Sequence, residues 1–171
     1  FSKWNLSGDW EIGVPNTVNR VNTSVSGTKV LATKLASNYR NDATDDAQII
    51  KQMYVSHGEK LHIEFKAFVY TQELYSGHLR DGAQLLMNGS NVVLNSSDPN
   101  LLGSFRIRAT DFSYVDYMGI RGQSAMNVYA SFSADLNITE TGTKDLIFRF
   151  LSDPSITEAG VYIDNIIIYK T

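Results

Sequence analysis

The sequence predicts an all-β protein that folds as an antiparallel β-sandwich of the jelly-roll type. Short apolar runs alternate with polar residues along the chain, and turn signals separate them at short intervals. Apolar residues at helical spacing are missing from every part of the sequence. The clearest signal is the last 27 residues, Asp145 to Thr171, where two alternating apolar runs flank a polar loop that contains Asp-Pro. Two packed antiparallel sheets are the architecture that this pattern favours.

Size and composition fit one globular domain. The 171 residues are enough for one sizeable core, so we expect a single β-sandwich domain over 1–171, excised from a larger protein. The net charge is −3 and basic residues do not cluster, which argues against nucleic acid as a partner. No apolar run reaches the roughly 18 residues that span a bilayer, so membrane insertion is not expected. The absence of cysteine excludes disulfides and thiolate metal sites.

Four strands are predicted in the first half of the chain. The first, Trp10–Val14, alternates after a Ser-Gly-Asp turn, and its tryptophan is expected in the core. A β-rich run covers Thr28–Leu35, and a further strand covers Ala47–Val55. The best alternating run is Leu61–Tyr70, which follows a turn at Ser56-His57-Gly58-Glu59.

The strand Leu61–Tyr70 has an unusual second face. One set of alternate residues is apolar and is expected to face the core: Leu61, Ile63, Phe65, Ala67 and Val69. The other set begins with three polar residues and ends in Phe68 and Tyr70. Rings beside charged neighbours on a non-core face can stack on sugar rings or fill a partner interface. The alternative is that a loop or the second sheet covers them, because strand aromatics are mostly packing residues.

The second half of the chain predicts a hairpin and further strands. The hairpin covers 81–94 and closes at Asn88-Gly89, a strong two-residue turn signal. Strands are expected over Leu101–Ala109, over 127–136 with Val128 facing inward, and in the final two runs. The segment Asp111–Gln123, which contains Tyr114 and Tyr117, is either a binding loop or a tyrosine-rich strand edge.

Four aspartates are candidate metal ligands. Asp42, Asp45 and Asp46 lie close together in a predicted polar loop over 36–46, and carboxylates of irregular loops are ligands that Ca²⁺ takes. The alternative is a solvated acidic turn. Asp164 lies in the middle of the final apolar run. It must therefore be exposed at an edge, hydrogen-bonded, paired with a cation such as Arg149, or bound to a metal.

Four segments of the chain carry a resemblance to a known family: GDWEIGVP, SGTKVLATKLASNY, LHIEFKAFVYTQELYSGH and LIFRFLSDPSITEAGVYIDNIII, in this order. Together they resemble the jelly-roll accessory domains found beside bacterial secreted peptidases and in cleaved-adhesin proteins. Those domains are similar to MAM domains and to jelly-roll carbohydrate-binding modules. The resemblance implies a secreted or cell-surface location, neighbouring domains in a larger chain, and a non-catalytic role in adhesion or glycan binding.

The resemblance also bears on a cofactor. Related carbohydrate-binding modules hold a structural Ca²⁺ with a Glu near the first strand and an Asp of the final strand. Asp164 matches the Asp, so a structural Ca²⁺ is expected here, although the Glu has no counterpart. The family often has Tyr-Asp-Gly-Gly where this chain has Tyr75-Ser76-Gly77-His78, so an Asp is missing there.

Two function classes follow from the sequence. The first is a non-catalytic module that binds a glycan or a cell-surface protein, with the candidate contacts Phe68, Tyr70, Tyr75, His78, Tyr114 and Tyr117. The alternative is a structural or protein-interaction domain of a secreted multidomain protein or a virion exterior. An enzyme is not expected, because the three histidines lie in different segments and neither a Gly-x-Ser-x-Gly elbow nor an HExxH motif occurs.

Overall fold

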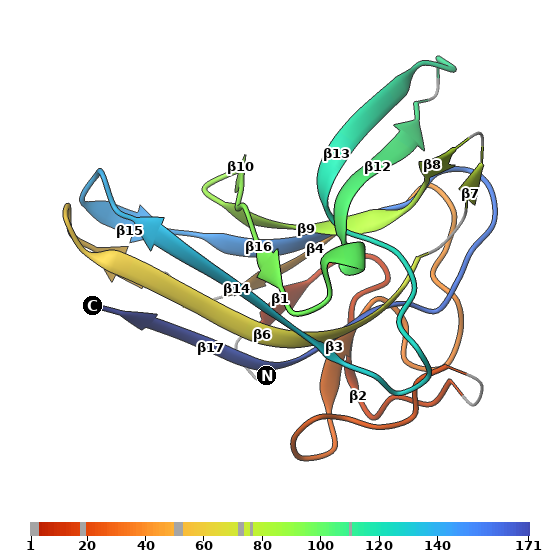
Figure 1. Ribbon diagram of the computed structural model, residues 1–171, viewed down its shortest axis with the longest axis horizontal. Coiled ribbons are helices and arrows are strands. Elements are labelled where there is room, and N and C mark those ends of the chain that lie inside the picture. The colour runs from red at the N-terminus through yellow and green to blue at the C-terminus, as the bar shows by residue number, and fades with distance from the viewer. Residues whose placement is uncertain (1–3, 18–19, 50–52, 72–73, 76, 110) are drawn as a thin grey trace.

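Two antiparallel sheets pack face to face and make up most of the molecule (Figure 1). A computed structural model describes residues 4–17, 20–49, 53–71, 74–75, 77–109 and 111–171. Sheet A has the strand order β1 (Trp4–Leu6), β4 (Thr44–Ile49), β16 (Leu146–Leu151), β9 (Gly82–Met87), β13 (Tyr114–Ile120) and β12 (Leu102–Arg108), with β10 (Ser90–Asn91) paired to β9 off this path. Sheet B has the order β11 (Asn95–Ser96), β14 (Ala130–Asn137), β6 (Lys60–Tyr70), β17 (Gly160–Lys170), β3 (Val30–Ala32) and β2 (Glu11–Gly13).

Two small ribbons and one short turn complete the described elements. The strands β5 (Met53–Val55) and β15 (Gly142–Lys144) pair with each other, as do β7 (Leu74–Tyr75) and β8 (His78–Leu79). A single 3-10 turn covers Pro99–Leu101. No helix in the described part of the chain has the length and apolar character needed to cross a membrane.

Eight of the strands follow the jelly-roll order. In chain order they are β3, β4, β6, β9, β13, β14, β16 and β17. Sheet B holds the first, last, third and sixth of them side by side, and sheet A holds the second, seventh, fourth and fifth. Two successive Greek keys produce this arrangement. The predicted all-β jelly roll is therefore confirmed, and the last two strands of the chain lie in different sheets.

The core lies between the sheets and follows the predicted alternation. The five apolar residues of β6 that were expected to face inward are all buried there. Phe65 of β6 stacks on Phe132 of β14 at 5.2 Å, and its ring meets the edge of Phe148 of β16 at 5.1 Å. Trp10 is also buried in this cluster. Each fully buried large apolar side chain contributes about 1.5–3 kcal/mol, so these residues hold the two sheets together.

A bulge in β17 explains the unbroken apolar run near the end of the chain. Asp164 pairs with Lys66 and Ile167 pairs with Glu64, so β17 carries one residue more than β6 over this interval. Asn165 takes up the extra residue with a left-handed φ of 54°. The inward-facing positions therefore change parity, and Ile166 packs on the core after the bulge.

A second, smaller apolar cluster covers the outer side of sheet B. It contains seven buried residues: Val21, Val30, Ala32, Phe68, Tyr70, Ala159 and Tyr162. The segment around Val21 reaches this side of the sheet through hydrogen bonds to the loop before β14, where Asn127 binds both Asn22 and Thr23. The long loops thus form a partial third layer (Figure 1).

Three expectations about strand limits need correction. The predicted loop over 36–46 ends three residues earlier, because Thr44, Asp45 and Asp46 belong to β4 and pair with β16. The single strand expected over 47–55 is two strands, β4 and β5, in different sheets. Val128 was expected to face inward but is exposed, because it lies in a turn before β14 begins.

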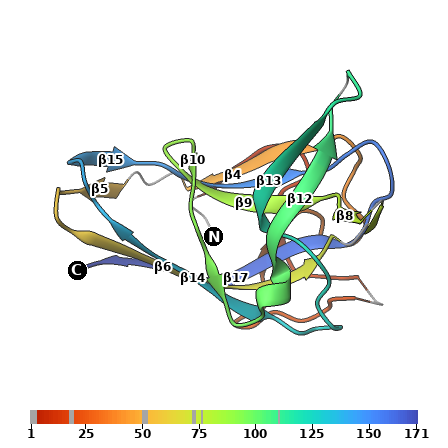
Figure 2. The same cartoon turned by 45° about the horizontal axis from the view of Figure 1, so that its top comes forward.

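The hairpin of β12 and β13 rises out of sheet A. It extends away from sheet B and beyond the body of the sandwich, as both views show (Figures 1 and 2). Of the two interpretations of 111–123, the strand is the correct one, because Tyr114–Ile120 pairs with β12 along its whole length. This projecting hairpin places Tyr114 and Tyr117 on its two opposite faces.

Candidate functional site

The two rings at the end of β6 are covered and offer almost no surface to a ligand. Phe68 has no exposed surface, and its ring lies 5.8 Å from that of Tyr162. Tyr70 is 8% exposed, its hydroxyl accepts a hydrogen bond from Gln123 at 2.7 Å, and the guanidinium of Arg20 lies 4.0 Å from its ring centre. The prediction that these rings contact a glycan is wrong, since distant loops fold over them.

The remaining predicted contacts gather at the projecting hairpin. Tyr114 is 51% exposed. The hydrogen bond from Arg106 lowers the pKa of the Asp116 carboxyl, and His78 lies near enough to add a smaller contribution. Tyr75 pairs with His78 through the backbone of the β7–β8 ribbon, and its side chain is outside the described residues. The structure therefore brings His78 and Tyr114 to one end of the molecule.

Tyr117 lies on the opposite face of β13 and belongs to the outer surface of sheet A. Its position is three residues before Ile120, which is in the core, so the two side chains point to opposite sides. The ring of Tyr117 stacks on that of Phe105 at 5.6 Å with an angle of 21° between the planes. Phe105 is buried, so Tyr117 rests on a rigid support and is partly exposed.

Three polar side chains form a row across the same outer surface. Arg149 of β16 pairs directly with Asp46 of β4 on one side and with Gln84 of β9 on the other. Directly paired residues place their side chains on the same face of a sheet. That face is the outer one, because the alternate residues Phe148 and Phe150 point into the core. We call Asp46, Arg149, Gln84 and Tyr117 the outer-face site.

The polar groups of the outer-face site hold one another in fixed positions. Arg149 donates two hydrogen bonds to Asp46, from Nε to Oδ1 at 2.8 Å and from Nη2 to Oδ2 at 3.0 Å. Gln84 is 8% exposed, and its Nε2 donates to the carbonyl oxygen of Met118 at 3.2 Å and to Oδ1 of Asn91 at 3.4 Å. The bonds to Asp46 raise the pKa of Arg149, and Tyr117 lies near enough to contribute.

A glycine lets β13 approach β9 closely beside this row. Gly119 lies between Gln84 and Tyr117 along the outer surface, and a Cβ there would lie 2.2 Å from the carbonyl oxygen of Ala83 and 3.3 Å from Cγ of Gln84. Any other residue at Gly119 would therefore distort the pairing of β13 with β9. The site combines an apolar ring with planar hydrogen-bonding groups on a rigid sheet, which suits a polar ligand with an apolar face.

The candidate metal ligands have other partners. Asp45 is buried, and its carboxylate accepts hydrogen bonds from Asp9 N at 2.9 Å and from Arg40 at 2.5 Å. Asp46 binds Arg149, which the sequence offered as one candidate partner of Asp164; Asp164 takes the hydrogen-bonded alternative instead. Asp42 is exposed at a turn with a φ of 54°. These carboxylates do not converge on a common point.

Asp164 is held by backbone N–H groups. Its Oδ2 accepts hydrogen bonds from Val25 N at 2.8 Å and Ser26 N at 2.9 Å, and its Oδ1 accepts one from Asn165 N at 2.7 Å. Among the described residues, no group of three or more His, Cys, Asp or Glu side chains could hold a metal ion. The carboxylate of Asp164 is thus engaged by N–H donors, and the structural Ca²⁺ that the resemblance implied remains a prediction.

Comparisons with known proteins give structural matches only. No protein-family model matches the sequence, and no curated protein matches it. The chain is similar to the CBM22-1 xylan-binding domain of Paenibacillus barcinonensis Xyn10C, with 10% identity, a TM-score of 0.44, and coverage of 96% of this chain and 83% of that one. It is also similar to TmCBM61 in complex with β-1,4-galactotriose, with 13% identity, a TM-score of 0.46, and coverage of 100% and 90%.

A third match involves a larger enzyme chain. This is the CBM22-1–GH10 part of the Clostridium thermocellum endo-1,4-β-D-xylanase 10B in complex with xylohexaose. The identity is 14% and the TM-score 0.49, and the match covers 98% of this chain and 26% of that one. At these values no ligand and no residue role is transferred to the present chain. The resemblance to peptidase-associated and MAM-type domains also remains a prediction.

Sequence reasoning missed most of the outer-face site. It identified Tyr117, but considered Asp46 only as a metal ligand or part of a solvated turn, and Arg149 only as one candidate partner of Asp164. Gln84 was not singled out at all. Alternation alone marks Arg149 as outward-facing, because it lies between Phe148 and Phe150. Its neighbours across the sheet become known only with the strand register.

Proposed function

We propose that this domain is a carbohydrate-binding accessory module that uses the outer-face site and does no chemistry on its ligand. The observation that carries this proposal is the partly exposed ring of Tyr117, fixed on Phe105, beside the Asp46–Arg149–Gln84 row. A pyranose has one apolar face that can lie on such a ring, while its hydroxyl groups both donate and accept hydrogen bonds. Arg149 offers donors in a plane and Asp46 offers acceptors, while the 8% exposed Gln84 borders the row.

The proposal gives each side chain a role. The flat phenol ring of Tyr117 stacks on the ring of one sugar residue and fixes its position. Asp46 and Arg149 are preorganised by their two hydrogen bonds, so little side-chain entropy is lost when they bind hydroxyl groups. An open sheet surface with no enclosing walls binds weakly, and attachment then depends on several linked modules acting together. Secretion and a neighbouring domain in a larger chain belong to this proposal.

The test is binding to a panel of neutral soluble polysaccharides, measured by affinity electrophoresis and titration calorimetry. Two variants, Tyr117→Ala and Arg149→Gln, are each expected to weaken the affinity about tenfold or more, since each removes a stacking ring or a charged hydrogen-bond donor. The matched control is Tyr54→Ala, because Tyr54 is also an exposed strand tyrosine but lies on the separate β5–β15 ribbon.

Unfolding curves of the variants separate lost binding from lost folding. If the wild type binds a polysaccharide and both variants bind it equally well, the outer-face site is not the binding surface. If the wild type binds no member of the panel, the proposal of a carbohydrate-binding module fails, and the protein-interaction alternative becomes the better one. Release of reducing ends from a bound polymer would contradict the non-catalytic role.

A further inference from the structure

The projecting hairpin carries a second cluster, on the face opposite Tyr117. Arg106 and Arg108 of β12 pair directly with Asp116 and Tyr114 of β13, so these four side chains share one face. The guanidinium of Arg106 lies 5.7 Å from the ring centre of Tyr114, and that of Arg80 lies 5.0 Å from the same ring. Arginine side chains therefore flank the ring of Tyr114.

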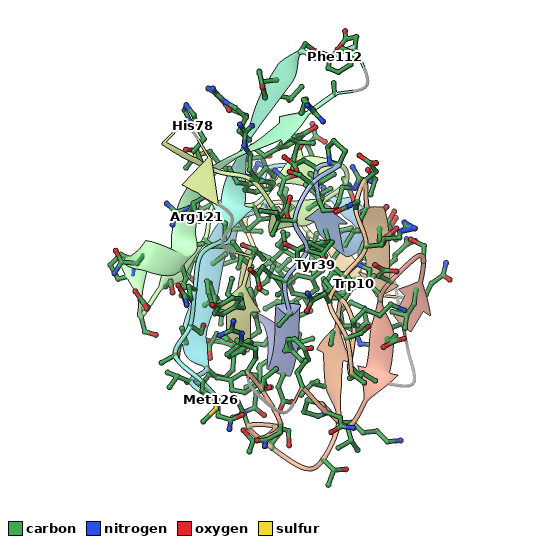
Figure 3. The ribbon with its side chains drawn as sticks, turned by 90° about the vertical axis from the view of Figure 1, so that its right-hand side faces the viewer. Trp10, Tyr39, His78, Phe112, Arg121 and Met126 are labelled. Carbon is green, nitrogen blue, oxygen red and sulfur yellow. The ribbon has the colours of Figure 1, made fainter. Side chains whose placement is uncertain are left out.

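The turn at the end of the hairpin presents a further ring to solvent. Phe112 is 74% exposed, and its backbone has a left-handed φ of 67°, a strained conformation for a bulky residue. The turn is fixed by a hydrogen bond from Phe112 N to Ala109 O at 3.0 Å, and by Asp111, which accepts from Ser113 N at 3.0 Å and Ser113 Oγ at 2.5 Å. Figure 3 shows Phe112 at the far end of the hairpin, well away from Trp10 and Tyr39 in the body.

The charged side chains of this face are not all paired with one another. Arg106 is neutralised by Asp116 through two hydrogen bonds, at 2.7 and 3.1 Å. Asp111 is engaged by Ser113, as described above, and makes no ion pair among the described residues. Arg108 makes no ion pair either in the part of the chain that the structure describes, and its guanidinium lies 5.6 Å from the ring centre of Phe112. A guanidinium that packs against a ring keeps its N–H edge for an acceptor in its own plane.

We propose that this hairpin face is a subsite for a sugar residue that bears a carboxylate, that is, a hexuronic acid within a polysaccharide. The proposal rests on the carbohydrate-binding function proposed above and adds a ligand class to it. The carboxylate accepts two parallel hydrogen bonds from Arg108, because the fork of the guanidinium matches the two carboxylate oxygens. The exposed rings of Phe112 and Tyr114 then lie beside the pyranose.

The negative charge of a uronic acid is repelled by the chain as a whole but attracted by the hairpin face. The whole chain has a net charge of −3, which repels a polyuronate in general. On the hairpin face, Arg108 forms no ion pair with a carboxylate of the described residues. Its attraction to a carboxylate of the ligand weakens as salt rises.

The experiment compares polygalacturonate with its fully methyl-esterified form and with a neutral galactan, by affinity electrophoresis at low salt and by calorimetry. We expect the wild type to be retarded by polygalacturonate more than by the ester. Arg108→Gln should weaken polygalacturonate binding about tenfold or more, and Arg108→Lys should also weaken it, since an ammonium group cannot bind a carboxylate in two parallel bonds.

The control is Arg20→Gln, which removes the same charge from another arginine–aromatic pair, Arg20 on Tyr70. It should bind polygalacturonate as the wild type does. Equal binding by Arg108→Gln and the wild type, or equal retardation by the acid and its ester, would overturn the subsite. Binding to dextran sulfate with the same loss in Arg108→Gln and no preference for polygalacturonate would overturn the assignment to a carboxylate.

The outcomes separate this subsite from the function on which it rests. If neutral polysaccharide binding is lost in Tyr117→Ala and polygalacturonate is bound no better than its ester, the carbohydrate-binding function stands and the subsite fails. If no polysaccharide of either kind is bound, both fail together.

Discussion

Replacing Asp164 by Ala should lower the free energy of unfolding more than replacing any exposed acidic residue of the domain by Ala. Its carboxylate is 2% exposed and accepts hydrogen bonds from the backbone N–H groups of Val25 and Ser26, which lie almost 140 residues away in the chain. It thereby attaches the loop before β3 to the bulge in β17. Without the carboxylate, these N–H groups have no partner in the protein and the loop loses its attachment.

The magnitude follows from the two bonds that cross from the loop to the strand. A hydrogen bond to a charged group contributes roughly 1.5–3 kcal/mol. We take the lower value for each bond, because Val25 and Ser26 are near solvent and water can replace part of the interaction. The expected loss for Asp164→Ala is therefore about 3 kcal/mol, which corresponds to a fall in melting temperature of about 6–12 °C for a domain of this size. Asp164→Asn keeps an acceptor oxygen without the charge and should lose about half as much.

The assay is urea unfolding followed by tryptophan fluorescence, with Asp135→Ala as the control. The side chain of Asp135 is 77% exposed where it pairs with His62, so its removal should change stability by about 0–1 kcal/mol. A loss below about 1 kcal/mol for Asp164→Ala, or a loss no larger than that of Asp135→Ala, would refute the view that this carboxylate holds the loop in place.

Two further predictions concern pH and metal. Burial and the nearby negative charge of Asp164 raise the pKa of Tyr129 above its ordinary value of 10.0. The contribution of the protonated Tyr129 hydroxyl to stability is therefore complete below pH 10, and it is lost as the pH rises towards the pKa of the folded state. The unfolding free energy should fall by up to about 1.4 kcal/mol per pH unit above pH 10 on account of this group, and should fall less steeply in Tyr129→Phe; identical slopes would contradict this. Because the candidate ligands Asp45, Asp46 and Asp164 bind protein groups, we expect excess chelator to leave the melting temperature unchanged; a fall of several degrees would show that a Ca²⁺ ion is bound to the folded state.

Alternation within single strands predicted the fold well. The inward set of β6, the hairpin at Asn88-Gly89 and the two final strands were all identified, because a residue's side of a sheet depends on its parity along its own strand. Alternation failed where the backbone breaks the rule. The bulge at Asn165 changes parity within β17, and no sequence pattern marked it.

The candidate sites were predicted only in part. Tyr114 and Tyr117 were identified as aromatic residues in a polar stretch, and both have exposed surface. Phe68 and Tyr70 were chosen by the same reasoning and are buried. Nothing in the sequence of β6 distinguishes the two cases, because the cover over Phe68 comes from Tyr162, Tyr129 and the loop at Val21.

The sequence by itself determined that the chain forms β-strands and which side chains of most strands face inward, since both properties are local and repeat every two residues. Only the tertiary structure decided which outward side chains reach solvent and which polar groups meet. Asp46, Arg149 and Gln84 lie on three strands that are far apart in the chain, and the strand register alone brings them into one row. Burial and pairing of this kind depend on segments that the local pattern does not connect.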